Sequence, residues 1–284
     1  MLLAAAMVAS LALDPLPFPD VHKYLPSPMP SLGRPSRALF TFEDGWTNLN
    51  HGSYGAPARA VQMVQRNWMD VMESNPEEFI RWRQYAAIDH VRFRLAEYIG
   101  ADVDDVVLID NASHGMNAVL RSLAERLAHD ALVLDLSLAY TMVKNTLSYL
   151  ETVFGHRVIT ANLTLAELAT PGQLVSDDAI IAAVQHQLVA HSGAIKLVSV
   201  SHITSTPAIV LPLARLARLA HQHGALIVAD GAHCLGQLPL DVPNLGVDFY
   251  VTNGAARAPR LAWKPRLDST WNSRDRTRAQ LRGT

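Results

Sequence analysis

Residues 195–233, IKLVSVSHITSTPAIVLPLARLARLAHQHGALIVADGAH, determine the predicted fold. Residues 195–199 and 225–229 are apolar runs typical of buried strands, and residues 213–223 between them have the apolar spacing of a helix. Two strands joined by such a helix form a βαβ unit, in which the strands run parallel. This stretch therefore predicts an α/β fold.

The same alternation of helices and strands extends through most of the chain. Helices are expected over residues 58–72, 83–99, 111–127, 141–154, 177–190 and 213–223. Strands are expected over residues 105–109, 131–136, 156–160, 195–199, 225–229 and 247–251. We therefore predict a mostly parallel sheet flanked by helices, with no internal repeat.

Composition excludes several classes of protein. The 284 residues are 49% apolar and carry a formal net charge of −2, so a sizeable core is expected and a broad nucleic-acid-binding surface is not. One cysteine excludes a disulfide framework, and the 12 histidines lack the spacing of a metal site. No apolar run reaches the ~18–20 residues that a membrane span needs. We expect a cytoplasmic protein without nucleic-acid, metal or membrane partners.

The two ends of the chain differ in composition from the middle. Residues 1–40 form a Pro-rich N-terminal extension, and the absence of Lys or Arg before Lys23 favours an extended lead-in over a signal peptide. Residues 41–254 are expected to form one large domain. Residues 255–284 have a net charge of +6 and contain no Val, Ile, Phe, Met or Tyr. This composition predicts a divergent, disordered basic tail.

Polar and aromatic side chains follow the predicted strands at the points where the strands end. They are Asn111, Ala112, Ser113, His114 and Gly115 after the first strand, Tyr140 after the second, His202 after a later one, and Asp230 and His233 after the next. Ligands of parallel α/β sheets bind at the carboxyl ends of the strands. The sequence therefore predicts one ligand site at this edge.

Each of these groups has a functional and a structural interpretation. Residues 111–115 offer free N–H groups at a helix N-terminus, which suits a phosphate, but Ser113 could instead be a simple N-cap. Tyr140 could stack on a planar ring or fill the core. Asp230 follows a fully apolar strand, where a carboxylate is desolvated unless a cation or protonated nitrogen meets it. His233 could donate a hydrogen bond to an oxygen of the same ligand. His202 could equally be a loop histidine that contacts no ligand.

Five stretches together resemble the class V aminotransferase branch of the fold-type I pyridoxal-phosphate (PLP) enzymes. They are TNLNHGSYG (47–55), NPEEFIR (75–81), NASHGMN (111–117), SHITS (201–205) and DGAH (230–233). Within this branch, the stretches resemble isopenicillin N epimerase-like proteins and fungal hercynylcysteine sulfoxide lyases. The resemblance covers about residues 33–254 and implies transaminase, epimerase or C–S lyase chemistry on an amino acid.

The resemblance implies a PLP site in the large domain. Residues 111–115 would hold the phosphate, and Tyr140 would stack on the pyridine ring. Asp230 would pair with the protonated ring nitrogen and keep the ring an electron sink. His202 and His233 would contact the side of the ring that bears the 3-oxygen.

The resemblance also implies contacts on the substrate side and a partner. The loop containing Asn50, His51 and Ser53 lies near the substrate in similar enzymes. Arg81 and Arg83 are candidates for a substrate carboxylate, with ordinary ion pairing as the alternative for both. Similar enzymes are homodimers whose cleft is completed by the partner subunit, an arrangement expected to be weaker in this chain.

The sequence departs from the family pattern where the catalytic lysine should stand. The family motif continues Thr-Asn-Gly-His-Lys-Trp, and its Lys forms the Schiff base. In this sequence Gly254 is followed by Ala255, Ala256 and Arg257, with Ala256 in the Lys position and Lys264 eight residues later. The small C-terminal domain of the family is not in the sequence either. We therefore expect an inactive chain without a catalytic residue of its own.

Two interpretations of this departure remain open. The chain could derive from a longer enzyme through a reading-frame or splicing change, or it could be a non-catalytic truncated paralogue. In the second case it binds PLP weakly or pairs with a full-length subunit. A plain nucleotide-binding domain is disfavoured because no Gly-x-Gly-x-x-Gly follows a strand.

Overall fold

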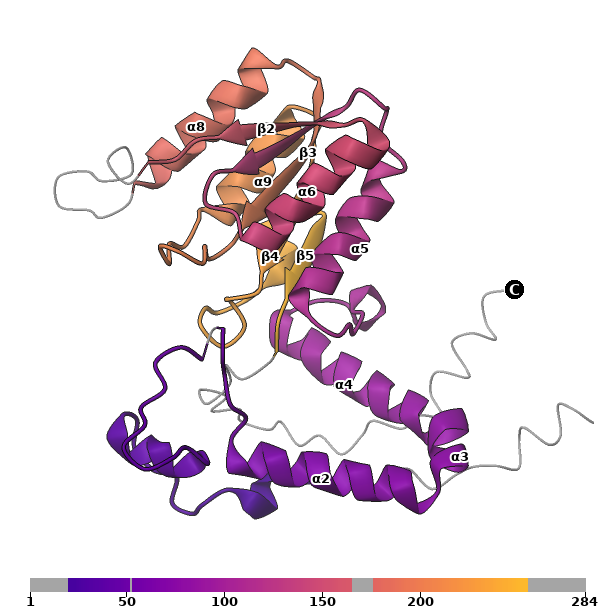
Figure 1. Ribbon diagram of the computed structural model, residues 1–284, viewed down its shortest axis with the longest axis vertical. Helices are drawn as coiled ribbons and strands as arrows, with labels where there is room; N and C mark the ends of the chain where they lie inside the picture. Colours follow the sequence, from indigo (N-terminus) through magenta and orange to yellow (C-terminus); the bar gives the residue numbers. More distant parts are fainter. Residues whose placement is uncertain (1–19, 52, 165–175, 255–284) are drawn as a thin grey trace, which may run out of the picture.

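Five parallel strands form the centre of the protein, in a computed structural model that describes residues 20–51, 53–164 and 176–254 (Figure 1). The strands are β1 (Leu132–Leu136), β2 (Arg157–Ala161), β3 (Ile195–Ser201), β4 (Leu226–Gly231) and β5 (Phe249–Thr252). Their order across the sheet is β2-β1-β3-β4-β5, and every neighbouring pair is parallel. The predicted α/β fold is confirmed.

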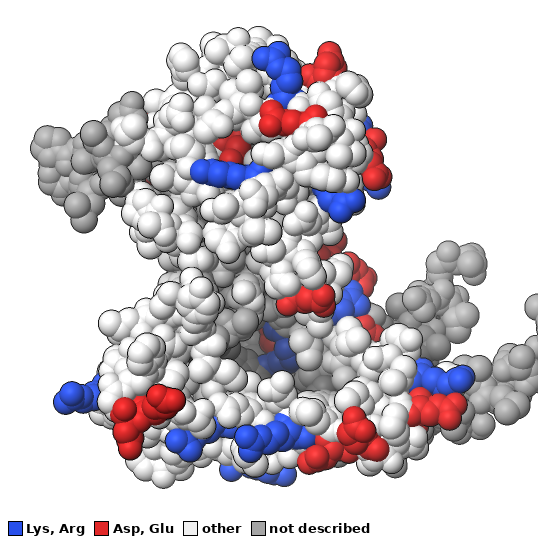
Figure 2. Space-filling model, in the orientation of Figure 1, with Lys and Arg blue, Asp and Glu red and all other residues white. Residues whose placement is uncertain are grey.

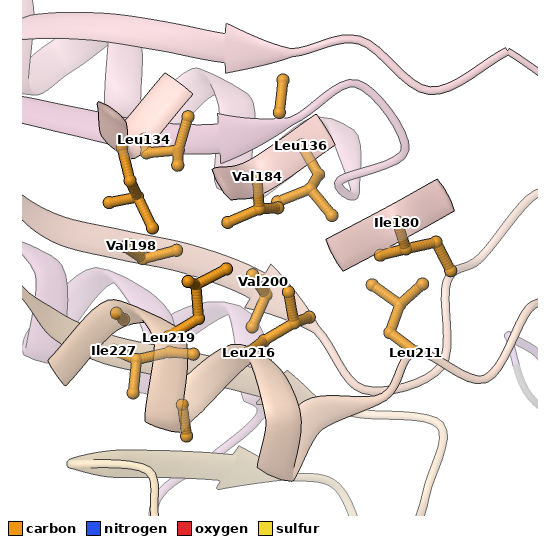
Figure 3. Close-up of a cluster of buried hydrophobic side chains, with 14 of the residues drawn as sticks. Leu134, Leu136, Ile180, Val184, Val198, Val200, Leu211, Leu216, Leu219 and Ile227 are labelled. Carbon is orange, nitrogen blue, oxygen red and sulfur yellow. The ribbon is translucent and has the colours of Figure 1, made fainter. Parts of the chain in front are cut away.

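Helices cover both faces of the sheet. α5 (Ala112–Ala124) and α6 (Thr141–Phe154) pack on one face, where Val133, Leu197 and Val228 point toward them. α8 (Asp177–Ala190) and α9 (Leu213–Gln222) pack on the other face. Side chains alternate between the two faces along a strand. The neighbouring residues Leu134, Val198 and Ile227 therefore point to this other face and belong to the core beneath α8 and α9 (Figure 3). The predicted bounds of all four helices are right to within three residues at either end.

The predicted strand over residues 105–109 is wrong. Residues 103–105 form the 3-10 helix η4 (Val103–Asp105), and Arg92 donates to the carbonyls of Val103 and Val106 at 2.7 Å each. Val107, Leu108 and Ile109 are 76%, 40% and 46% exposed, and no described strand pairs with them. A β-branched composition favours a strand, but strand formation needs a neighbour that the described residues do not supply.

Helices before the sheet form a separate layer, which we call the helical arm (residues 59–99). It comprises α2 (Arg59–Ser74), α3 (Pro76–Glu78), the π-helix η3 (Phe79–Arg83) and α4 (Gln84–Ile99). Gly100 ends α4 in the left-handed conformation, with φ 73°, which is the usual conformation of a glycine at a helix C-terminus. Figure 1 shows α4 descending from the sheet and α2 and α3 lying at its far end.

The arm meets the sheet region at one end of α4, and its α2 helix packs against η1 (Val21–Tyr24) in the segment before the arm. Ala96 and Ile99 pack with Val106, Leu235 and Leu240, which belong to the segments before α5 and after β4. Three short helices complete the described fold: η1 (Val21–Tyr24), η2 (Arg34–Leu39) and α10 (Val242–Leu245). Residues 1–19 of the proposed N-terminal extension and the whole proposed basic tail, residues 255–284, lie outside the described residues, whereas residues 20–40 of the extension are described and contain η1 and η2. Among the described helices, none has the length and apolar character to cross a bilayer.

Candidate functional site

Asp230 lies near the carboxyl end of β4 and is only 7% exposed. Its Oδ1 accepts a hydrogen bond from the Ala232 backbone N–H at 3.0 Å. Its carbonyl accepts one from the His202 N–H at 2.8 Å, which ties the loop after β3 to the end of β4. A buried carboxylate is thereby held at the edge where parallel sheets bind their ligands.

The first turn of α5 lies close to this carboxylate. Val251 on β5 is the register partner of Asp230, and it contacts Gly115 of α5. A Cβ on Gly115 would lie 2.7 Å from Cγ1 of Val251 and 2.4 Å from Cδ1 of Ile109, so a glycine is required for this approach. Adjacent strands are about 4.8 Å apart, so the N-terminus of α5 lies over the strand next to Asp230.

The N-terminus of α5 has the arrangement of an anion site. Asn111 is the N-cap, and its Oδ1 accepts from the His114 N–H at 2.9 Å. The alternative that Ser113 is the cap is therefore wrong. No hydrogen bond joins the half-buried Ser113 hydroxyl to another described residue, whereas the exposed His114 ring contacts Asp110 at 3.1 Å. Ala112 is buried, so the hydroxyl of Ser113 and the first-turn N–H groups are the candidate phosphate contacts.

His202 is buried beside a tyrosine, Tyr250, that the sequence pattern did not single out. Its Nδ1 lies 2.9 Å from the Tyr250 hydroxyl, and the two rings meet edge to face at 5.8 Å. Burial lowers the pKa of His202, so the neutral ring is favoured. Burial also raises the pKa of Tyr250 above its usual range, and the neighbouring Cys234 and Asp230 raise it further. A neutral hydrogen-bonded pair therefore lies next to the Asp230 carboxylate.

Gly231 makes room for this pair. A Cβ at position 231 would lie 2.3 Å from Cζ of the Tyr250 ring, because both residues face the same side of adjacent strands. The glycine directly after Asp230 was the only signal in the sequence for this close packing. Tyr250 itself had the ordinary appearance of an aromatic residue in a strand.

Two further predicted contacts flank the sheet edge. Tyr140 begins α6 and is 46% exposed, so the alternative that it fills the core is wrong. Its ring is accessible for stacking at the edge of β1. His233 lies half-buried in the turn after β4, three residues beyond Asp230.

The two arginines predicted as possible substrate contacts lie in the π-helix of the helical arm, away from β4 and Asp230. Arg81 pairs with Glu77 at 3.1 Å, and Arg83 pairs with Glu78 at 2.6 Å, both in the helical arm. Figure 1 shows α3, which directly precedes the π-helix η3 that contains both arginines, at the end of the arm farthest from β4 and β5. For both arginines the ion-pair interpretation describes the structure.

The loop of Asn50, His51 and Ser53 has local contacts. Asn50 Oδ1 accepts from the Ser53 N–H at 3.2 Å, and the His51 ring packs against Phe40 and Phe42 at 5.3 and 5.7 Å. Nδ1 of His51 is buried without a hydrogen-bond partner among the described residues. Ala256 and Lys264 lie outside the described residues. Within the described ranges, no group of three His, Cys, Asp or Glu side chains could hold a metal ion.

Comparison with protein families agrees with the motifs. The family described as Aminotransferase class-V matches residues 56–255. These residues include the anion site, Tyr140, both histidines and Asp230.

Curated relatives support the same assignment. The chain is 32% identical over 221 residues to "Putative L-cysteine desulfhydrase 1" of Oryza sativa subsp. japonica, covering 74% of this chain and 44% of the relative. Isopenicillin N epimerase of Amycolatopsis lactamdurans is 28% identical, covering 77% of this chain and 52% of the relative. Hercynylcysteine sulfoxide lyase of Schizosaccharomyces pombe is 21% identical, covering 78% and 53%. The chain thus spans about half the length of these curated relatives.

Solved structures share the fold. A variant of the cystine C–S lyase C-DES, with glycine covalently linked to its PLP cofactor, superposes with a TM-score of 0.66 at 22% identity. The match covers 78% of this chain and 56% of that one. The predicted fold and the class-V family are confirmed, but the L-cysteine desulfhydrase match has a higher identity than the matches to the two subgroups that the motifs suggested.

Proposed function

The chain belongs to the class-V aminotransferase family, and from this premise we propose that it binds PLP at the carboxyl edge of β4 without turning over a substrate. The family uses PLP, which supplies an electron sink for reactions at the α-carbon of an amino acid. The full-length chemistry that we propose for this lineage is C–S bond cleavage in a cysteine-type amino acid, as in the relatives named L-cysteine desulfhydrase. Transaminase and epimerase chemistry are the alternatives.

The residues of the site fit the cofactor chemically. The Ser113 hydroxyl and the N–H groups at the start of α5 would hold the phosphate, since a helix N-terminus favours an anion. The Asp230 carboxylate would accept a hydrogen bond from the protonated ring nitrogen. Tyr140 would cover one face of the ring. His233 and the Nε2 of His202 would face the 3-oxygen, because Nδ1 of His202 already bonds Tyr250.

The position of Asp230 carries this proposal. An ionised carboxylate that is 7% exposed at a strand end is stabilised by a positively charged ligand group at the same edge. The N-terminus of α5, over the neighbouring strand, favours a negative group. A ligand that carries both an anionic phosphate and a protonated nitrogen complements the two features together.

The absence of turnover rests on position 256. An alanine there has no amine to form a covalent link to the cofactor or to move the α-proton. The chain's own residues would therefore bind and orient PLP but transfer no proton. The alternative, in which Lys264 takes over both roles, predicts covalent attachment at that residue.

Equilibrium dialysis against PLP tests binding. We expect Asp230→Asn to weaken PLP binding at least tenfold, because the neutral amide cannot pair with a charged nitrogen. Asp178→Asn is the matched control, since Asp178 is an exposed aspartate on α8 that pairs with Arg215. Thermal unfolding of both variants separates a binding defect from a folding defect. Equal affinity in wild type and Asp230→Asn would overturn the assignment of the site.

Borohydride reduction and peptide mapping test the chemistry. PLP-soaked wild type should remain unlabelled, whereas the double variant Ala255→His, Ala256→Lys should be labelled at position 256. A pyridoxyl group on Lys264 of the wild type would contradict the non-catalytic assignment. The dialysis result would stand in either case, so binding and catalysis are judged separately.

A further inference from the structure

We propose that Tyr250 is a positioning residue of the cofactor site, because its hydroxyl donates to Nδ1 of His202 and thereby keeps the proton of that ring on Nε2. The proposal rests on the proposed function and deepens it, since it names the state of the ligand atom that His202 meets. An Nε2–H group is a donor. Its partner on the ligand is therefore an oxygen that accepts, which in PLP is the ionised 3-oxygen.

The backbone holds His202 from two sides. Its N–H donates to the Asp230 carbonyl at 2.8 Å, and its carbonyl accepts from the Leu211 N–H at 2.9 Å. The residue is buried at the end of β3. The strand that carries Asp230 and the segment before α9 thus fix where His202 lies. They leave open the rotation of the ring and the choice of the nitrogen that carries the proton.

Tyr250 determines the rotation of the ring. Nδ1 of His202 lies 2.9 Å from the Tyr250 hydroxyl, and the two rings meet edge to face. The phenol reaches this position across Gly231, where the Cβ of any other residue would overlap the Tyr250 ring and its hydroxyl. Because Nδ1 is turned toward Tyr250, Nε2 points away from it, and Nε2 forms no hydrogen bond with a described residue.

The available protons favour Tyr250 as the donor. Burial raises the pKa of the Tyr250 hydroxyl above its usual range and lowers the pKa of His202, so a protonated phenol faces a neutral imidazole. The phenol has one proton and two partners, Nδ1 of His202 and the buried Cys234 thiol. A thiol sulfur is a weak acceptor, so the phenol proton goes to the imidazole nitrogen. A neutral imidazole has a single N–H, which is then on Nε2.

A donor at Nε2 selects the form of the ligand. A buried N–H without an acceptor is costly, and an ionised oxygen satisfies it most strongly because hydrogen bonds to charged groups are stronger than neutral ones. If Tyr250 instead accepted from an Nδ1–H, Nε2 would be an acceptor and would favour a protonated 3-hydroxyl. The tautomer of His202 therefore decides which form of the cofactor's 3-oxygen is bound.

Nitrogen-15 NMR of the full chain without PLP tests the orientation. The shifts of the two ring nitrogens show which one carries the proton, and His202→Gln identifies the His202 signals among those of the 12 histidines. We expect the Nε2–H tautomer in wild type, with an Nδ1 shift that changes in Tyr250→Phe. Tyr24→Phe is the matched control, because the Tyr24 hydroxyl also has a hydrogen bond, accepting from Asn67 of α2 at 2.6 Å. An Nδ1–H tautomer in wild type, or an unchanged Nδ1 shift in Tyr250→Phe, would overturn the proposal.

Equilibrium dialysis with PLP and with 3-deoxypyridoxal phosphate tests the consequence for binding. The analogue keeps the phosphate, the aldehyde and the ring nitrogen, and it lacks the oxygen that His202 would meet. We expect Tyr250→Phe to weaken PLP binding about fivefold or more and to leave binding of the analogue unchanged, whereas Tyr24→Phe changes neither. Equal weakening of both ligands would reveal a purely structural role for Tyr250. That result, or an unchanged affinity for PLP, would overturn the proposal.

Nonspecific attraction of the phosphate should be the same for both ligands. On the face of the protein in Figure 2, Lys and Arg lie scattered among Asp and Glu rather than gathered in one patch, so no broad positive field is present on that face. If Tyr250→Phe does not fold, wild type decides alone, and equal affinity for PLP and the analogue would overturn the proposal. Absence of PLP binding to wild type would overturn the proposed function. The NMR measurement needs no cofactor and would still show whether Tyr250 orients His202.

Discussion

The sheet region and the helical arm differ sharply in how they use apolar residues. All five residues of β1 are buried, and α5, α6, α8 and α9 each bury a stripe against the sheet. The arm is almost entirely helical, yet it buries only three of its 41 residues. Local sequence specifies helices in both regions, but among the described residues the sheet gives its helices a much larger apolar surface to pack on than the arm has.

The largest expected effect is the difference in unfolding free energy between an apolar truncation in the sheet region and one in the arm. Leu134 is fully buried between β1 and the helices α8 and α9, so Leu134→Ala should lower the free energy of unfolding by about 2–5 kcal/mol. Met69 on α2 is 54% exposed, so Met69→Ala should change it by less than about 0.5 kcal/mol. Urea unfolding of both variants, followed by circular dichroism at a concentration where wild type is monomeric, measures the difference. Comparable losses would show that the arm contributes to the same cooperative unit.

The same contrast explains what the sequence could predict. The helices and strands of the sheet region were predicted to within a few residues because burial on both faces imposes clear apolar runs and helical spacing. Residues 105–109 were predicted wrongly because their β-branched composition indicates a strand only if a neighbouring strand exists. The π-helix η3 was missed because its side-chain spacing is close to that of an α-helix.

The location of the candidate site could be predicted from the sequence, but most of its hydrogen bonds could not. Position after a strand identified Asp230 because strand ends converge at one sheet edge. The same rule could not distinguish Asn111 from Ser113 as the cap, since both are good capping residues. It also could not identify Tyr250, whose hydrogen bond to His202 depends on the alignment of β5 with β4.

A pH-dependent effect of intermediate size is expected from a buried acid in the sheet region. Asp135 on β1 is 3% exposed, and its Oδ1 has no hydrogen-bond partner among the described residues. Burial raises the pKa of Asp135 from 3.8 to about 7, against the opposing effects of the Leu136 N–H and Lys144. The folded state therefore holds a proton that the unfolded state releases, and stability should fall as pH rises from about 4 to about 7.

Asp135→Asn should remove this dependence. The amide keeps the size of the side chain but cannot ionise, so the variant should be more stable than wild type at pH 8 by up to about 4 kcal/mol. Urea midpoints measured at intervals from pH 4 to pH 8 test the sign. A variant whose profile runs parallel to that of wild type would mean that Asp135 is ionised at little cost in the folded protein.

The smallest effect is expected for an ion pair in the arm. Glu77 and Arg81 lie 3.1 Å apart with most of their surface in water, so screening and side-chain entropy offset their attraction. Glu77→Gln should therefore change the unfolding free energy of the monomer by less than about 0.5 kcal/mol. Urea unfolding of wild type and Glu77→Gln measures this difference. A large loss of monomer stability would place the pair within the folded core of one chain and weaken the contrast between arm and sheet.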